Sequence, residues 1–291
     1  MTADRQRRNI AVAAEALAEL MADHRLVITH GNGPQVGLLA LQSAALTQGM
    51  AMPLDVLDAE SAGMIGYLLE QEIMNRAGPA LPSATLLTRV EVDPDDPAFA
   101  NPSKPIGPPY DEAVARRLAA DRGWTVGPDG AAYRRLVPSP RPRAIVELHA
   151  IRLLVDGGVT VVAGGGGGIP VARGADGRHV GIEAVVDKDL ASALLAQGID
   201  ADALLLLTDV DAVWTDWGRP GGRALRRATP KALRRLTFDA GSMGPKVEAA
   251  CRFVEATGRD AVIGSLEDAA AMLAGTAGTR VSATGDGLAF R

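Results

Sequence analysis

The hydrophobic positions of the chain alternate between short apolar runs and longer stretches with helical spacing. Apolar residues three and four positions apart predict amphipathic helices, whereas short runs of Val, Leu and Ile between turn residues predict buried strands. By these patterns, helices are predicted at residues 5–25, 36–46, 58–75, 111–120, 144–155, 190–196, 241–256 and 266–273. Strands are predicted at 26–29, 84–92, 159–163, 203–207 and 261–263.

Strands that alternate with helices along the whole chain indicate an α/β fold, because parallel strands are joined by crossovers that are usually helical. We therefore predict a three-layer sandwich, in which helices cover both faces of a central, mainly parallel sheet. The carboxyl ends of parallel strands meet at one edge of the sheet, where open α/β sheets bind ligands. Four strand ends carry loops rich in Gly, Thr or Asp, so this edge is the expected site.

A proline-rich segment interrupts the alternation. Residues 93–110 contain too many prolines for a helix or a central strand, and residues 124–126 and 133–137 flank a Pro-Asp-Gly turn as in a hairpin. We predict that residues 93–143 form a small lid subdomain, inserted into one larger domain over residues 1–291. Such insertions often close over a site, and Lys104 would lie on this one.

Composition limits the classes of function. The 291 residues are 47 % hydrophobic, enough for a large core, and the net charge of −5 is spread without a long run of one sign. Neither nucleic acid nor a membrane is therefore expected as a partner. The single cysteine, Cys251, suits a reducing compartment, and no apolar run approaches the ~18 residues of a membrane-spanning helix. We expect a cytoplasmic protein.

Lysine is rare in this chain. Only 4 of the 30 Lys and Arg residues are lysines, which suggests that a lysine is kept where a compact point charge is needed. Lys188 stands between Asp187, the predicted N-cap of a helix, and Asp189. Lys246 follows a proline that suits a first helical position, so both lysines are expected beside the positive end of a helix. An ordinary role as a surface charge is the alternative for each lysine. We assign that role to Lys231 and favour a functional role for the others.

Two glycine-rich turns follow predicted strands. Residues 30–35 read His-Gly-Asn-Gly-Pro-Gln, and residues 164–168 are five consecutive glycines. Such turns can leave backbone N–H groups facing an anion. An ordinary tight turn would also explain the first. A flexible linker would also explain the second, but linkers are seldom bracketed by a buried strand and Ile-Pro-Val, so phosphate binding is favoured there.

Together these features favour phosphoryl transfer, which needs positive charge around the moving group and reactants held in line. The sequence has no Cys/His metal pattern and no Ser/His/Asp constellation. It also lacks the Gly-x-x-x-x-Gly-Lys-[Ser/Thr] sequence of P-loop proteins and the motifs of protein kinases.

Five motifs resemble those of the carbamate kinases, in the amino acid kinase superfamily. They are HGNGPQVG at 30–37, NPSKPIGP at 101–108, GGGGIPV at 165–171, GIEAVVDKD at 181–189 and GSMGPK at 241–246. The resemblance runs from residue 1 to about Val281. It implies reversible phosphoryl transfer between ATP and carbamate, giving carbamoyl phosphate and ADP with Mg2+. It also implies a homodimer that works towards ATP in arginine-type catabolism.

The resemblance further implies a role for each motif residue. Lys188 and Lys246 would neutralise the transferring phosphoryl group, and Asp189 would orient both lysines. Lys104 would reach the carbamoyl phosphate end from the lid. Donors to phosphate or substrate would come from Gly31, Asn32, Gly33, Gly165, Gly166, Gly167 and Gly168. Nucleotide contacts would come from Thr208, Asp209, Val210, Met243 and Pro245. No metal ligands are assigned.

The sequence departs from the family pattern at its start. Carbamate kinases begin with a strand that ends in a Gly-Gly-Asn-Ala type loop, and this chain begins after it. A start codon assigned too far downstream is the favoured explanation; the alternative is a shortened, weakly active or non-catalytic nucleotide-binding paralogue. Another amino acid kinase, such as an acetylglutamate or fosfomycin kinase, would share the sheet and the lysines but not the motif at 101–108.

Overall fold

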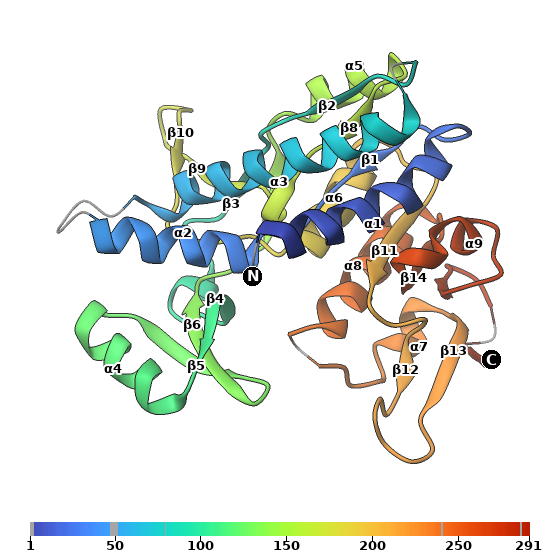
Figure 1. The fold of residues 1–291 in the computed structure, drawn as a ribbon. Helices are drawn as coiled ribbons and strands as arrows, with labels where there is room; N and C mark the ends of the chain where they lie inside the picture. The colour runs from blue at the N-terminus through green and yellow to red at the C-terminus, as the bar shows by residue number, and fades with distance from the viewer. Residues whose placement is uncertain (1–2, 47–51, 79, 240, 286) are drawn as a thin grey trace.

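The computed structural model describes residues 3–46, 52–78, 80–239, 241–285 and 287–291 (Figure 1). Its α-helices are α1 (Ala3–Met21), α2 (Gly33–Leu46), α3 (Leu54–Ala77), α4 (Glu112–Arg122), α5 (Leu148–Asp156), α6 (Lys188–Gly198), α7 (Pro230–Leu233), α8 (Met243–Thr257) and α9 (Ala269–Leu273). The short 3-10 helices are η1 (Pro97–Phe99), η2 (Gly165–Gly167) and η3 (Leu266–Asp268). None of the described helices combines the length and the apolar character needed to span a membrane.

The first ten strands are β1 (Val27–Ile28), β2 (Ser83–Thr85), β3 (Arg89–Val92), β4 (Lys104–Tyr110), β5 (Thr125–Asp129), β6 (Ala132–Val137), β7 (Pro142–Ile145), β8 (Thr160–Val162), β9 (Ile169–Arg173) and β10 (His179–Gly181). The remaining strands are β11 (Leu204–Thr208), β12 (Trp214–Thr215), β13 (Arg223–Ala228), β14 (Ala261–Ser265), β15 (Thr279–Val281) and β16 (Leu288–Phe290).

A parallel sheet with the order β1-β8-β2 lies between helices on both of its faces. Successive side chains of a strand point to opposite faces, and β8 illustrates the consequence. Val162 belongs to the apolar cluster of α1 and α3, whereas Val161 belongs to the cluster of α5 and α6. The predicted layered α/β fold is confirmed, and Figure 1 shows these helices on either side of the strands.

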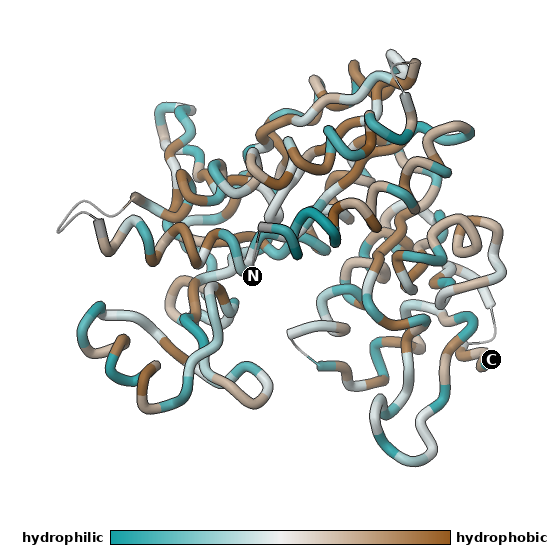
Figure 2. Tube along the Cα trace, in the orientation of Figure 1, coloured by the Kyte–Doolittle hydropathy of each residue, from teal (hydrophilic) through white to brown (hydrophobic). Residues whose placement is uncertain are grey.

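The C-terminal part of the chain builds a second core around β11 and β14, which are parallel. Here β15 is antiparallel to β14, so the sheet is mixed. Helix α6 takes part in both cores, because Ala191 and Leu195 pack with β8 whereas Ala193 and Ala196 pack with α8 and β14. In Figure 2 hydrophobic segments follow the packed helices and strands, while the charged first turns of α1 are hydrophilic.

The predicted lid contains a separate antiparallel sheet, with the order β4-β6-β5, and α4 (Figure 1). Strand β4 carries three of the prolines, Pro105, Pro108 and Pro109, and it lies at the edge of its sheet, where a missing N–H is tolerated. The lid sheet meets α2 where Gly107 and Gly37 lie backbone to backbone. A Cβ on Gly37 would come 2.0 Å from the Gly107 Cα, so this position requires glycine, and Gly107 has φ +73°, a conformation that favours glycine.

Two sequence predictions are wrong in this region. The strand predicted at 84–92 is two strands, because β2 pairs with β8 whereas β3 pairs with β7 and β9 in another sheet. The helix predicted at 144–155 begins only at Leu148, since Ala144 and Ile145 belong to β7. Strand β7 pairs with β3 outside the lid sheet, so residues 142–143 at the predicted lid boundary leave that sheet.

Candidate active site

The site is built around the first turn of α6. Asp187 is the N-cap, as predicted, and its Oδ1 accepts hydrogen bonds from the N–H groups of Asp189 (2.9 Å) and Leu190 (3.2 Å). These bonds satisfy donors that a helix start leaves open. They also fix the backbone of Lys188, the first residue of the helix.

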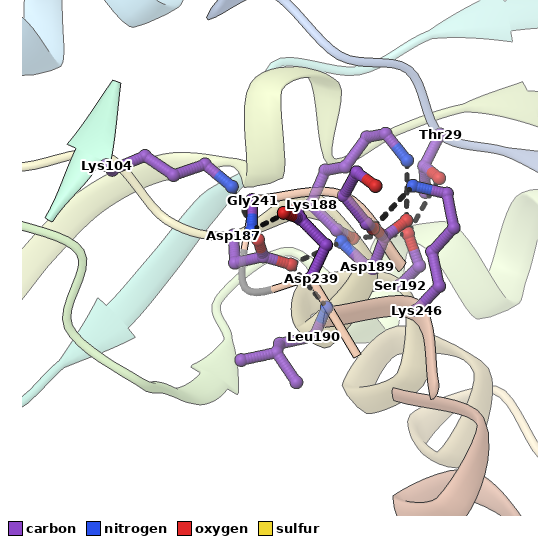
Figure 3. A network of polar contacts seen from close by, with 11 residues as sticks. Thr29, Lys104, Asp187, Lys188, Asp189, Leu190, Ser192, Asp239, Gly241 and Lys246 are labelled. Atoms are coloured by element: carbon purple, nitrogen blue, oxygen red, sulfur yellow. Dashed lines mark hydrogen bonds and ion pairs between the residues drawn. The ribbon is translucent and has the colours of Figure 1, made fainter. Parts of the chain in front are cut away.

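Asp189 joins the two lysines that the sequence singled out. Lys188 Nζ lies 2.5 Å from Asp189 Oδ1, and Lys246 Nζ lies 3.2 Å from Asp189 Oδ2 (Figure 3). Only 6 % of the Asp189 side chain is exposed, so a carboxylate largely removed from water holds both ammonium groups. The structure therefore places Lys188 and Lys246 on the same rim of the fold.

Lys104 approaches the same helix start from the lid sheet. Its Nζ lies 2.5 Å from Asp187 Oδ2 (Figure 3). Burial raises the pKa of Asp187, but the charge and hydrogen bond of Lys104 and the two backbone donors outweigh it, so this pKa lies below its ordinary value. Three ammonium groups thus meet two carboxylates, which leaves a formal excess of one positive charge.

The helix ends add to this positive character. Lys188 opens α6 and Lys246 lies in the first turn of α8, so the two helices start at the shared Asp189. The amino end of a helix carries about half a positive charge and favours anions. Two helix starts and three lysines make this rim suited to a phosphate.

The two glycine-rich turns lie side by side because β1 and β8 are parallel neighbours, with Ile28 opposite Val162. The Gly166 N–H donates to the carbonyl oxygen of His30 at 2.7 Å. Thr29 Oγ1 lies 2.7 Å from Ser192 Oγ, which ties the end of β1 to α6 (Figure 3). The predicted convergence of strand ends at one edge is therefore observed.

The five glycines at 164–168, for which the sequence predicts a phosphate cradle, are largely hydrogen-bonded within the protein. Most of their N–H groups already donate to protein acceptors: Gly164 to Thr88 Oγ1, Gly166 to His30 O, Gly167 to Gly164 O and Gly168 to Gly165 O. An N–H that is bonded within the protein is not free for a phosphate. Phosphate binding by Gly165, Gly166, Gly167 and Gly168 stays a prediction, and Gly165 has no acceptor for its N–H among the described residues.

Close packing requires glycine at two positions of this loop, Gly166 and Gly167. Gly166 has φ +71°, and a Cβ there would lie 2.2 Å from Asn32 Nδ2. Gly167 has φ +100°, and a Cβ there would lie 2.2 Å from the carbonyl oxygen of Val186. The loop therefore passes directly against Asn32 and against the residue that precedes Asp187.

Free backbone donors lie in the other glycine-rich turn, at the start of α2. The N–H groups of Gly31, Asn32 and Gly33 have no hydrogen-bond acceptor among the described residues. A Cβ on Gly31 would lie 3.5 Å from the side chain of Lys188, so this turn borders the lysine cluster. Gly31, Asn32 and Gly33 thus remain candidate anion donors through their backbone.

The side chain of Asn32 has partners that the sequence did not reveal. Its Nδ2 donates to Asp58 Oδ1 (2.9 Å) and to Ser61 Oγ (2.8 Å), so both amide hydrogens are bound within the protein. Burial raises the pKa of Asp58 to about 8, and the negative charges of Asp55 and Glu183 add to this, against the lowering effect of the Asn32 hydrogen bond. The predicted donation from Asn32 is therefore proposed for its backbone N–H, because both hydrogens of the side-chain amide are already bound.

Asp58 was missed because the predicted helix 58–75 begins there, so the residue was not placed on a buried face of the helix. In the structure α3 begins four residues earlier, at Leu54, and Asp58 is only 1 % exposed. The available signal was the pair Asp58 and Ser61, three positions apart on the same side of the helix as the apolar residues Leu54, Leu57 and Ile65.

His30 lies against the glycine loop and is not placed for proton transfer. Burial lowers its pKa, the hydrogen bond with Gly31 opposes this, and the charge of Lys188 lowers it further. The imidazole is therefore neutral at pH 7. A Cβ on Gly165 would lie 2.7 Å from the His30 ring, which fits packing as its role.

The predicted nucleotide residues lie on two elements of the second core. Thr208 ends β11, and Asp209 and Val210 follow it. Met243 and Pro245 lie in the first turn of α8, and Met243 packs against the same apolar cluster as β11. Met243 and Pro245 thus lie in the same helix start as Lys246, whereas Thr208, Asp209 and Val210 lie at the end of the strand that shares an apolar cluster with Met243.

Fold and site together describe a phosphotransferase of the amino acid kinase type. The model of the amino acid kinase family matches residues 1–265, and the chain belongs to this family. The carbamate kinase of Haemophilus influenzae is 51 % identical over 290 residues, covering 100 % of this chain and 94 % of the relative. The carbamate kinase of Rhizobium meliloti is 54 % identical over 286 residues, covering 98 % and 88 %.

Solved structures agree with these relatives. The carbamate kinase of Giardia lamblia bound to citric acid superposes with a TM-score of 0.90 at 40 % identity, covering 97 % of this chain and 92 % of that one. The same enzyme bound to AMP-PNP gives a TM-score of 0.85 at 41 % identity, with the same coverage. The resemblance predicted from the five motifs is confirmed.

Proposed function

We propose that this protein is a carbamate kinase, which transfers a phosphoryl group reversibly between ATP and carbamate. The observation that carries the proposal is the Asp189 carboxylate that holds Lys188 and Lys246 together at two helix starts. Carbamate kinase relatives that are 51–54 % identical over nearly the whole chain support the choice of acceptor.

The chemistry requires electrostatics more than acid–base catalysis. An oxygen of carbamate, already an anion, forms a bond to the γ-phosphorus while the bond to the ADP oxygen breaks. No proton has to move, and negative charge spreads over the phosphoryl oxygens in transit. Lys188 and Lys246 would neutralise that charge, and Asp189 would keep both ammonium groups in position before the reaction begins.

Lys104 is the predicted contact to the carbamoyl phosphate end. In the structure its Nζ binds Asp187 and its side chain is 33 % exposed, so a bound anion would compete with Asp187 for this ammonium group. We propose that Lys104 exchanges Asp187 for substrate, and that the segment 93–143 acts as a lid that excludes water during transfer.

ATP and ADP are the nucleotides, with Thr208, Asp209, Val210, Met243 and Pro245 as the proposed contacts. An AMP-PNP complex of the Giardia lamblia relative supports this assignment. Mg2+ would enter on the nucleotide phosphates and neutralise part of their charge. No group of three His, Cys, Asp or Glu side chains among the described residues is arranged to hold a metal ion.

The protein is also proposed to work as a homodimer. Met64, Tyr67 and Met74 are 39 %, 62 % and 41 % exposed, and their spacing puts them on one face of α3. A row of exposed apolar side chains is typical of a surface that another subunit covers. A cytoplasmic location, ATP synthesis in arginine-type catabolism and small-molecule partners complete the proposal.

The test is ATP formation from ADP and carbamoyl phosphate, followed by a luminescent ATP assay. Lys188→Ala and Lys246→Ala should each lower turnover at least ~100-fold, the low end for one preorganised electrostatic group. Lys231→Ala removes an exposed lysine of α7 and is the matched control. Wild-type protein that binds ADP but forms no ATP would instead support the non-catalytic alternative. Near-normal turnover of both folded variants would contradict the roles assigned to the lysines.

A further inference from the structure

The carboxamide of Asn32 is held in one orientation. Each of its two Nδ2 hydrogens has an acceptor on α3, Asp58 Oδ1 and Ser61 Oγ. Its other face lies against Gly166, where even a methyl group would not fit. Asn32 is 4 % exposed, so the surrounding atoms leave no space for another rotamer of its side chain.

Ser61 determines which end of the amide points towards α3. Its hydroxyl donates to the carbonyl oxygen of Asp58 at 3.1 Å, so its single hydrogen is already used. Towards Asn32 the Ser61 oxygen can only accept, and the partner must therefore be the NH2 end of the amide. This assignment holds whether Asp58 is neutral or ionised.

Asn32 Oδ1 is consequently left as an acceptor without a donor among the described residues. The two carboxylates of the lysine cluster are taken: Asp189 by two lysines, and Asp187 by Lys104 and two backbone N–H groups. Asp58 Oδ2 also lacks a partner, but it is sealed from solvent. Asn32 Oδ1 is thus the unpaired acceptor beside a cluster that otherwise offers donors.

The substrate has one group that needs such an acceptor. The phosphate and carboxylate oxygens of carbamate and carbamoyl phosphate are hydrogen-bond acceptors, which the lysines and the backbone N–H groups can bind. The amino group is a hydrogen-bond donor and needs an acceptor. The Gly31–Gly33 turn borders Lys188, so Asn32 lies next to the lysine cluster that would bind the anionic groups.

We propose that Asp58 and Ser61 are positioning residues, which fix Asn32 so that its Oδ1 accepts a hydrogen bond from the amino group of carbamate or carbamoyl phosphate. This inference rests on the carbamate kinase function proposed above. It assigns a physical basis for choosing an amino-bearing acyl phosphate over one that carries a methyl group.

The experiment compares two phosphoryl donors for ADP: carbamoyl phosphate and acetyl phosphate, which has a methyl group in place of the amino group. The measured quantity is the ratio of their kcat/KM values. Wild-type protein should favour carbamoyl phosphate. The double variant Asp58→Ala/Ser61→Ala should lower the ratio at least about 10-fold, because Asn32 is no longer held and can leave the amino group without an acceptor. KM for ADP should stay the same.

Single variants still test the proposal if the double variant does not fold. Ser61→Ala should lower the ratio by about 3-fold, since one of the two hydrogen bonds remains. Asp58→Asn should keep the ratio near that of wild type, because the carboxamide oxygen that replaces Asp58 Oδ1 still accepts from Asn32 Nδ2. Glu60→Gln, an acid-to-amide change at an exposed position of α3, is the matched control.

The outcomes are distinguishable. Equal losses with both phosphoryl donors would mean that Asp58 and Ser61 only support the fold, and the inference would be overturned while the kinase function stands. A wild-type enzyme that uses both donors equally well would overturn it in the same way. If wild-type protein forms ATP from neither donor, the proposed function itself fails, and this inference fails with it.

Discussion

Asp58 makes the stability of this protein depend on pH in an unusual direction. Burial raises the pKa of Asp58 from 3.8 to about 8 in the folded protein, whereas the unfolded chain restores the ordinary value. Between these two values the native state binds one proton more than the unfolded state. The contribution of Asp58 to stability is therefore fully present below about pH 4. This contribution is lost as the pH rises towards 8.

The magnitude follows from the two pKa values. One pKa unit corresponds to about 1.4 kcal/mol, so a shift of roughly 4 units corresponds to a loss on the order of 5 kcal/mol across the whole window. Within the window the slope is about 1.4 kcal/mol per pH unit. Asp58→Asn cannot titrate. Its free energy of unfolding, relative to wild type, should therefore rise by about 3 kcal/mol between pH 5 and pH 7.

Urea unfolding followed by circular dichroism at pH 5, 6 and 7 measures this difference. Glu60→Gln removes a carboxyl from an exposed position on the same helix and should leave the pH dependence of wild type unchanged. A constant difference between Asp58→Asn and wild type from pH 5 to pH 7 would show that Asp58 titrates normally, and the reasoning from its burial would be refuted.

Three further predictions concern the site, the glycine loop and the subunit surface. Asp189→Asn should lower kcat for ATP formation ~100-fold or more, because the ammonium groups lose the carboxylate that holds them, and unchanged kcat would contradict this. Gly166→Ala should lower the melting temperature more than Gly158→Ala, since both have positive φ but only Gly166 adds a clash with Asn32; equal losses would refute the packing role. Tyr67→Asp should convert dimers to monomers in light scattering coupled to size-exclusion chromatography, and an unchanged dimer would exclude this face of α3.

The placement of the lysines could be predicted from the sequence because the signals were local. Asp187 is a favoured cap residue, Pro245 suits a helix start, and a helix start fixes the direction of the neighbouring side chains. Parallel strands then bring helix starts to one edge. Lys188 and Lys246 meet at Asp189 for these reasons, and no contact between distant segments had to be predicted separately.

The role of the glycine loop could not be predicted, because it depends on contacts between distant segments. A run of glycines shows that the backbone must adopt special angles or approach something closely, but it does not say whether that neighbour is a ligand or the protein. Here the neighbours are Asn32 and Val186. The same limit applied to Ile145, which joins β7 because β3 lies beside it, although the local pattern favoured a helix.

Helix α6 packs into both cores with small residues, Ala191 on one side and Ala193 and Ala196 on the other. Helix α8, which carries Lys246, contributes to only one of these cores. Because Ala193 and Ala196 pack directly against α8, α6 and α8 would move as one unit in any motion between the two cores, and the distance between Lys188 and Lys246 would be kept. A larger side chain at either alanine would push the two helices apart and separate the charged pair without touching it.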